Sequence, residues 1–234
     1  MDLATSIGGV ARALSSSTAD FGISTSLIAA FLRDQPADDA LAVLEDLIAM
    51  EAPIIGIGLD SAEVGHPPSK FTAVFDRARA AGLECVAHAG EEGPPGYISE
   101  ALDVLKVSRI DHGIRAMEDD ALVRRLVEEQ VPMTVCPLSN VRLRAVTNLA
   151  SHPLPRMLEA GLNVSIHSDD PSYFGGYLDD NLDQVVGTFA FDATTLAHLA
   201  ANSVRSAFLS EQRKVELLAE IDAWLNGHHT ATAP

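Results

Sequence analysis

The sequence predicts an α/β fold in which parallel strands alternate with helices. Six short apolar runs rich in strand-forming residues recur along the chain, and their starts lie roughly 25 to 30 residues apart, which is the length of a βα unit. The runs are almost continuously apolar rather than alternating, as expected of strands that are covered on both faces. They occupy residues 26–31, 54–59, 84–88, 107–112, 133–136 and 163–167.

Segments with a helical spacing of apolar residues fill the gaps between these runs. Phe71, Val74, Phe75 and Ala78 follow the i, i+3, i+4, i+7 pattern, and Gly82 is placed to end that helix. Regular alternation of strands and helices favours a parallel sheet with helices outside it. Further helices are predicted at residues 41–48, 122–127, 154–158 and 192–225, with a frayed end from residue 226.

Length and charge restrict the class of protein. The 234 residues suit one domain, residues 1–234, because single α/β barrels routinely have this length. The chain has 33 acidic residues against 16 lysines and arginines, and its formal charge is -17. This balance argues against partners such as nucleic acid or an anionic membrane surface, although one nucleobase in a pocket is compatible with it.

Three features of the sequence predict a cytoplasmic protein. The two cysteines, Cys85 and Cys136, lie inside apolar runs and suit a reducing compartment. No apolar stretch reaches the roughly 18 residues that a membrane span needs. The N-terminus carries an acidic residue where a signal peptide needs positive charge.

Polar, titratable residues follow each of the last four predicted strands. The carboxyl ends of parallel strands meet at one mouth, and in a (β/α)8 TIM barrel that mouth is where catalysis takes place. An open Rossmann-type sheet would carry a Gly-rich phosphate loop after its first strand, and the sequence has none. We therefore expect a (β/α)8 TIM-barrel type of fold, of which about six βα units are present. The strand-end residues lie at 88–91, 111–113, 137–140 and 168–171.

Several of these residues have side chains that bind divalent metal ions or carry protons. The imidazoles of His88 and His112 and the carboxylate of Asp169 suit zinc, iron or manganese. Glu91 would serve as a proton carrier beside the metal, and of the carboxylate pair Asp169 and Asp170 one would bind the metal while the other faces the substrate. Taken singly, a strand-end histidine commonly satisfies a hydrogen bond, and Asp-Asp-Pro usually forms a turn or a helix cap. Four such features at the same end of consecutive strands favour a metal-dependent active site.

The strand-end motifs together resemble the adenosine and adenine deaminase branch of the amidohydrolase superfamily. The resemblance extends from about residue 20 to about residue 210, and the motifs have the order and spacing of that family. Residues 58–71 and 171–177 resemble the adenine deaminase subgroup more than the nucleoside enzymes. The motifs are His88-Ala89-Gly90-Glu91, Arg109-Ile110-Asp111-His112-Gly113, Cys136-Pro137-Leu138-Ser139-Asn140 and Ser168-Asp169-Asp170-Pro171.

The resemblance implies a role for each motif residue. His88 and Asp169 would bind one Zn²⁺ ion, and Glu91 would donate a proton to N1 of the purine. His112 would orient or deprotonate the attacking water, and Asp170 would hydrogen-bond the imidazole edge of the base near N7. The implied reaction is hydrolytic deamination of adenine to hypoxanthine and ammonia, as in purine salvage. Deamination of adenosine is the alternative reaction.

One feature of the family is missing from the sequence. The family places a zinc-binding His-x-His pair on its first strand, and this chain has no His-x-His. With only six βα units, the chain is expected to lack two N-terminal units, on the order of 60 residues. Catalytic zinc normally has three or more protein ligands, so a non-catalytic remnant is the alternative to an enzyme. Unpaired strand edges lead us to expect an oligomeric or poorly soluble chain without deaminase activity.

The remaining polar residues of the motifs and their neighbours receive mainly structural interpretations. His167 alternates onto the strand face of the metal-binding carboxylate and is interpreted as a packing residue. His152 lies at a predicted helix start and is given no part in the site. Ser139 and Asn140 are either substrate contacts or turn residues. Cys136 is expected in the core.

Overall fold

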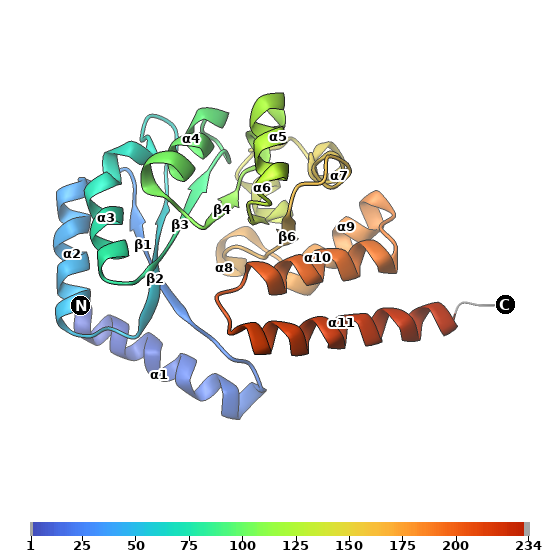
Figure 1. Cartoon of the computed structure of the whole chain (residues 1–234), viewed down its shortest axis with the longest axis horizontal. Helices are drawn as coiled ribbons and strands as arrows, with labels where there is room; N and C mark the ends of the chain where they lie inside the picture. The colour runs from blue at the N-terminus through green and yellow to red at the C-terminus, as the bar shows by residue number, and fades with distance from the viewer. Residues whose placement is uncertain (1, 232–234) are drawn as a thin grey trace. The chain divides into compact units, whose positions relative to one another are not determined.

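The computed structural model describes residues 2–231, which form two compact units (Figure 1). The first unit contains Met1–His88 and Ser99–Ser108, and the second contains Ala89–Ile98 and Arg109–Pro234. Each unit has parallel strands that alternate with helices, which confirms the predicted α/β class. The assignment of residues 1–234 to a single domain stays a prediction.

In the first unit, strands β1 (Leu27–Leu32), β2 (Ile54–Asp60) and β3 (Glu84–Ala89) are parallel neighbours in that order. Gly56 permits the close approach of β2 to β3, because a Cβ there would lie 2.7 Å from the backbone oxygen of Glu84. The helices are α1 (Leu3–Phe21), α2 (Ala37–Ala49) and α3 (Thr72–Ala80), with a 3₁₀ turn at Pro68–Phe71 and a π turn at Ala101–Leu105.

The apolar stripe predicted for α3 forms part of the core of this unit. Phe71, Val74, Phe75 and Ala78 are all fully buried, because side chains three and four residues apart share one helix face. No element is predicted from the sequence for residues 3–21, where the structure has α1. Leu3, Ile7 and Leu14 recur at helical spacing and could have predicted this helix, although none of the α1 side chains is buried.

In the second unit, β4 (Arg109–His112), β5 (Met133–Val135) and β6 (Val164–Ile166) are parallel neighbours in that order. All six strands of the chain occur where the apolar runs predict them, with ends that differ by at most two residues. Helix α4 (Pro95–Glu100) precedes β4. The other helices are α5 (Asp120–Glu128), α6 (Pro137–Arg142), α7 (Leu154–Glu159), α8 (Pro171–Phe174), α9 (Leu178–Phe189), α10 (Ala193–Ser206) and α11 (Glu211–Ala231).

The C-terminal part is two helices rather than the single stretch predicted. Helix α10 ends at Ser206, and α11 begins at Glu211 and lies beside α10 (Figure 1). Helix α11 continues to Ala231, and the frayed end from residue 226 stays a prediction. Residues 232–234 lie outside the described part of the chain. No helix within residues 2–231 is long and apolar enough to cross a membrane.

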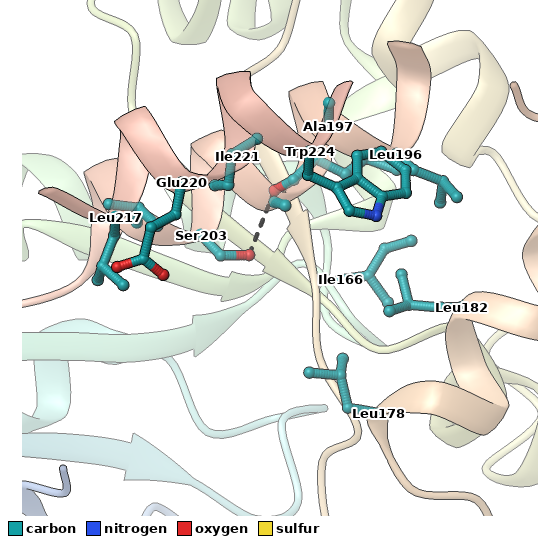
Figure 2. A pocket seen from close by; sticks show the side chains of 13 residues that line it. Ile166, Leu178, Leu182, Leu196, Ala197, Ser203, Leu217, Glu220, Ile221 and Trp224 are labelled. Carbon is teal, nitrogen blue, oxygen red and sulfur yellow. Dashed lines mark hydrogen bonds between the residues drawn. The ribbon is translucent and has the colours of Figure 1, made fainter. Parts of the chain in front are cut away.

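A pocket of about 520 Å³ lies among β6, α9, α10 and α11 (Figure 2). Its walls are mostly aliphatic, with Trp224 from α11 and Leu196 from α10 on one side and Leu182 from α9 on the other. Glu220 is the only ionisable residue among those that line it. This pocket therefore lacks the clustered histidines and carboxylates on which a metal-dependent hydrolytic site depends.

Candidate active site

Strands β4 and β6 each lead into a polar residue with a left-handed backbone. His112 is the last residue of β4 and has a φ of +64°, and Asp169, which follows β6, has a φ of +59°. Residues other than glycine pay roughly 1–2 kcal/mol for this conformation, and such residues cluster at functional sites. Six other non-glycine residues among those that the structure describes also have a positive φ, so the side-chain contacts, and not the backbone alone, distinguish these two positions.

The buried amide of Asn140 joins the two residues that were predicted to be catalytic. Its Nδ2 donates a 2.8 Å hydrogen bond to Glu91 Oε1 and lies 3.1 Å from His112 Nδ1. His112 Nδ1 and Glu91 Oε1 are themselves 3.4 Å apart. Asn140 lies on α6, which begins directly after β5 and its following Cys136. The second unit thus brings Glu91 and His112 together on one amide group.

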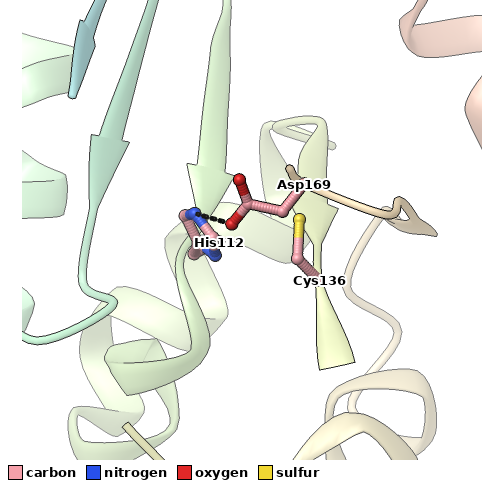
Figure 3. Close-up of side chains that lie close together, drawn as sticks. All are labelled: His112, Cys136 and Asp169. Atoms are coloured by element: carbon pink, nitrogen blue, oxygen red, sulfur yellow. Dashed lines mark ion pairs between the residues drawn. The ribbon is translucent and has the colours of Figure 1, made fainter. Parts of the chain in front are cut away.

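Asp169 approaches His112 at the other ring nitrogen. Its Oδ2 is 3.7 Å from His112 Nε2 and accepts a 2.6 Å hydrogen bond from Ser139 Oγ. Figure 3 shows the two side chains turned toward each other, with Cys136 beside them. A separation of 3.7 Å is too long for a direct hydrogen bond. Both atoms are instead placed to contact one water molecule or one ion lying to their side.

Cys136 belongs to the same cluster but fits the core role predicted for it. The ligand atoms of His112, Cys136 and Asp169 lie within 4.8 Å of one another. Burial raises the pKa of the Cys136 thiol well above its ordinary value, and the nearby carboxylate of Asp169 raises it further. Metal ions bind the thiolate and not the thiol, so a raised pKa does not favour Cys136 as a ligand.

His88 lies on β3 of the first unit, where a buried arginine holds its backbone. Arg33 is fully buried, and its Nη1 donates a 2.7 Å hydrogen bond to the carbonyl oxygen of His88. Its Nε donates a 2.9 Å hydrogen bond to the carbonyl oxygen of His66. One guanidinium therefore ties the end of β3 to the loop before Pro67. Arg33 cannot be recognised from the sequence, since nothing in its local pattern marks a buried charge.

Asp170 caps a helix, which was the simpler interpretation of the Asp-Asp-Pro motif. It precedes α8 and accepts a 3.1 Å hydrogen bond from the backbone N–H of Ser172 through Oδ1. Its side chain is exposed. A cap of this kind fixes the position of the carboxylate, so it is compatible with a contact to a substrate as well as with a structural role.

His152 is the residue whose placement the sequence did not indicate. It is buried, and its Nε2 lies 3.1 Å from Asn140 Oδ1, while its Nδ1 accepts a 3.0 Å hydrogen bond from the backbone N–H of Leu154. Burial lowers the pKa of His152 to about 4. The histidine assigned no role in the site is therefore a neutral hydrogen-bonding partner of the amide that holds Glu91 and His112.

His167 keeps the packing role predicted for it. Its Nε2 lies 2.8 Å from Ser165 Oγ on the same strand segment. Burial lowers the pKa of His167 to about 4, so the ring is neutral near pH 7. Asp111 on β4 accepts a 2.7 Å hydrogen bond at Oδ1 from Thr134 Oγ1 on β5.

The residues of the second unit fit a hard or borderline metal ion in type. Asp169 presents a carboxylate that is oriented by Ser139, and an oriented carboxylate beside an imidazole is a donor set typical of zinc. In residues 2–231 the group of His112, Cys136 and Asp169 is the only cluster of three such side chains with ligand atoms this close. A catalytic zinc site normally has three or more protein ligands, and Asp169 is the member of this group that the sequence predicts to be one.

Comparison with known proteins identifies the family to which this fold and cluster belong. A family model described as adenosine deaminase matches residues 1–224. The chain therefore belongs to the adenosine deaminase family, and the resemblance seen in the strand-end motifs is confirmed.

Its relatives narrow the comparison further. The adenine deaminase of Streptomyces coelicolor is 53% identical over 226 residues, which cover 96% of this chain and 66% of that protein. The adenine deaminase of Cupriavidus necator is 51% identical over 216 residues, covering 92% of this chain and 62% of that protein. The chain thus spans less than two thirds of the length of these curated relatives.

Solved structures confirm the barrel type of the fold. The crystal structure of an adenine deaminase from Arthrobacter aurescens has a TM-score of 0.95 and 63% identity, covering 97% of this chain and 69% of that chain. An amidohydrolase from Burkholderia ambifaria with bound Zn has a TM-score of 0.92 and 28% identity, covering 99% of this chain and 65% of that chain. Six βα units of such a barrel are present here, as the sequence predicted.

Proposed function

We propose that the protein to which this chain belongs hydrolyses adenine to hypoxanthine and ammonia. The observation that carries this proposal is the cluster in which Asn140 holds Glu91 and His112 while Asp169 faces the other side of the imidazole. A proton donor, an imidazole and a metal-binding carboxylate in one cluster are the groups that hydrolytic removal of an aromatic amine needs. The names of the relatives, adenine deaminase, indicate which purine is the substrate.

The metal would be one Zn²⁺ ion, for which His88 and Asp169 are the ligands that this chain provides. When bound, such an ion supplies Lewis-acid activation that lowers the pKa of a water molecule from about 16 to about 7. Ser139 would keep Asp169 oriented toward the ion through its 2.6 Å hydrogen bond. This support matters because hydrogen bonds to a ligating carboxylate fix its geometry and raise the affinity for the metal.

Glu91 would act as the proton donor to N1 of the purine. Carbon C6 of an aromatic base is a poor electrophile until N1 carries a proton, so a carboxylic acid must face this nitrogen. Glu91 is buried, and Asn140 donates to its Oε1. The acidic proton would therefore be carried by Oε2, and Asn140 would hold the carboxyl group in the orientation from which that proton is delivered.

His112 and Asp169 would position the attacking water between them. The 3.7 Å separation of His112 Nε2 from Asp169 Oδ2 lets both atoms contact a single oxygen to one side of the line that joins them. Attack of this oxygen on C6 forms a C–O bond. One proton of the water goes to the amino group, so that the C–N bond breaks and ammonia leaves, and the other restores the proton that Glu91 gave to N1. The 6-oxopurine product is hypoxanthine when the substrate is adenine.

Asp170 would contact the imidazole edge of the base near N7. Its carboxylate is exposed and fixed by the cap on α8. Because residues 58–71 and 171–177 resemble the adenine deaminase subgroup, we expect the space for a ribose to be closed and adenine to be preferred to adenosine. A steric clash excludes the larger substrate more strongly than a loss of favourable contacts would.

The test measures ammonia release from adenine and from adenosine by the purified chain with added zinc, together with its zinc content. Binding of hypoxanthine by calorimetry adds a readout that does not depend on turnover. The proposal expects hypoxanthine to bind, and adenine to exceed adenosine in kcat/KM in any preparation that is active. Turnover that favours adenosine contradicts the adenine assignment. A folded chain that binds neither hypoxanthine nor zinc identifies the non-catalytic remnant instead.

A further inference from the structure

A backbone N–H group sets the direction of a chain of hydrogen bonds that ends at His112. The N–H of Leu154 can only donate, so the Nδ1 atom of His152, at 3.0 Å, is an acceptor without a proton. Burial favours the neutral form of the His152 ring, which carries a single proton. Because Nδ1 has none, that proton is on Nε2. His152 Nε2 then donates across 3.1 Å to Asn140, and the amide atom that receives the hydrogen bond is Oδ1.

With Oδ1 of Asn140 facing His152, its NH₂ group faces the cluster. An amide nitrogen has two hydrogens to donate and no lone pair to offer. One hydrogen is directed to Glu91 Oε1 at 2.8 Å and the other to His112 Nδ1 at 3.1 Å. If His112 Nδ1 carried a proton, its N–H and the NH₂ group of Asn140 would be two donors facing each other. The 3.1 Å between these two nitrogens is shorter than the 3.4 Å from Nδ1 to Glu91 Oε1, so Asn140 is the nearer partner of Nδ1.

We propose that His152 and Asn140 are positioning residues that place the ring proton of His112 on Nε2, the nitrogen facing Asp169. The relay runs from Leu154 through His152 and Asn140 to His112, and all four residues belong to the second unit. In this arrangement His112 donates a hydrogen bond toward the space beside Asp169. It therefore orients the attacking water and does not take a proton from it, which decides between the two roles that the sequence left open.

The consequence for the reaction rests on the proposed function, whereas the position of the proton does not. Histidine labelled with ¹⁵N and measured at about pH 8, where free imidazole is neutral, distinguishes a ring nitrogen that carries a proton from one that does not. In the spectra of His112→Gln and His152→Gln the ring-nitrogen signals of the replaced histidine disappear, and this assigns the signals of the two residues. The proposal expects Nε2–H for both residues in the unmodified chain, and a proton on Nδ1 of His112 overturns it.

Two matched pairs of variants then test the relay. Asn140→Asp replaces the donating NH₂ by an oxygen of similar size that only accepts, so the proton of His112 should move from Nε2 to Nδ1. Asn148→Asp is the control, since Asn148 is exposed and caps a 3₁₀ turn through an oxygen that aspartate also has. An unchanged His112 signal in folded Asn140→Asp contradicts the proposal.

The second pair removes or keeps the donor at position 152. His152→Gln retains an N–H that can reach Asn140 Oδ1, so the His112 signal should stay as in the unmodified chain. His152→Leu removes the donor, so the side-chain amide of Asn140 can flip by exchanging its oxygen and nitrogen. A mixture of the Nε2–H and Nδ1–H forms of His112 is then expected. If both variants leave His112 equally unaffected, His152 is not part of the relay. The spectrum of the unmodified chain decides the proton position even where a variant does not fold.

An activity measurement separates this proposal from the proposed function. In a preparation that deaminates adenine, Asn140→Asp should lower kcat by about tenfold or more with little change in KM, because it alters the orientation of an essential group and not the binding of the base. If the spectra show the proton of His112 on Nε2 but no preparation deaminates adenine, the proposed function is refuted and the relay is not. Active enzyme with an Nδ1–H form of His112 would refute the relay alone.

Discussion

Ser139 Oγ donates a 2.6 Å hydrogen bond to Asp169 Oδ2, and Ser139 is itself fully buried on α6. The backbone of Asp169 has a φ of +59°, so the carboxylate is held from two directions, by a strained main chain and by a short hydrogen bond. A carboxylate fixed in this way loses little conformational freedom when it binds a metal ion, which is the role proposed for Asp169.

Replacing Ser139 with alanine should weaken zinc binding. Loss of a hydrogen bond to a ligating carboxylate typically costs 10–100-fold in metal affinity, and we expect Ser139→Ala to fall in that range. Competition with a chromophoric chelator measures the affinity. Ser172→Ala is a suitable control, because Ser172 is exposed and its backbone N–H, which caps α8, is retained. Equal affinities of the two variants would show that Ser139 does not orient the ligand.

Replacing Glu91 with glutamine should abolish most turnover while leaving zinc bound. The amide keeps the size of the side chain and an oxygen that can accept from Asn140, but it has no acidic proton to give to N1. In active preparations we expect kcat to fall by at least about 10²-fold. Glu92→Gln makes the same change at the next position, which is exposed. Near-normal turnover by Glu91→Gln would remove this residue from the mechanism.

His152 should make the chain less stable in mild acid. Its pKa is about 4 in the folded state, against an ordinary value of 6.5, because burial disfavours the charged ring. Between pH 6.5 and pH 4 the unfolded chain binds a proton that the folded chain does not, so the free energy of unfolding falls as the pH falls. Above pH 6.5 neither state binds the proton, and below pH 4 both do. The full loss from this group is about 3 kcal/mol.

Urea unfolding of the unmodified chain and of His152→Gln, compared from pH 7 to pH 4, measures this loss. Glutamine does not titrate, so the difference in stability between the two proteins should narrow or reverse as the pH falls. His167, whose pKa is also lowered to about 4, is present in both proteins and cancels in the comparison. Parallel pH profiles would mean that His152 is not a buried neutral histidine.

Replacing Arg33 should destabilise the first unit. The variant Arg33→Met leaves the partly buried carbonyl oxygens of His66 and His88 without the donors that they now have, and we expect a loss of about 2–4 kcal/mol in the free energy of unfolding. Arg33→Lys should recover only part of it, since a single ammonium nitrogen does not match the fork of a guanidinium.

The matched control for this position is Arg12→Met, which changes an exposed arginine on α1. Surface substitutions of this kind usually stay within about 0.5 kcal/mol. Chemical unfolding followed by circular dichroism compares the three variants. If Arg33→Met is as stable as Arg12→Met, the guanidinium does not tie β3 to the loop before Pro67.

Much of the fold is predictable from the sequence because its signals are local. A buried parallel strand needs a short run of apolar residues, and each of the six runs became a strand. The stripe from Phe71 to Ala78 likewise predicts the buried face of α3. Helix α1 was not predicted, although Leu3, Ile7 and Leu14 recur at helical spacing, and none of its side chains is buried.

The types of residues in the candidate site are also determined by the sequence, because polar groups at the carboxyl ends of parallel strands must lie at one edge of a sheet. Glu91, His112 and Asp169 were singled out in this way, and the structure places them together in the second unit. What the strand-end rule does not provide is the direction of each side chain or the atom that it contacts.

Those directions were decided by the tertiary structure alone. The amide of Asn140 meets Glu91 and His112 across sequence separations of 49 and 28 residues, and His152 completes the arrangement from another turn of the chain. The sequence left Asn140 between a substrate contact and a turn residue, and it gave His152 no part in the site. A hydrogen bond depends on the relative position of two atoms to within a few tenths of an ångström, and only the packing of α6 and the segment before α7 against the strand ends brings these atoms that close.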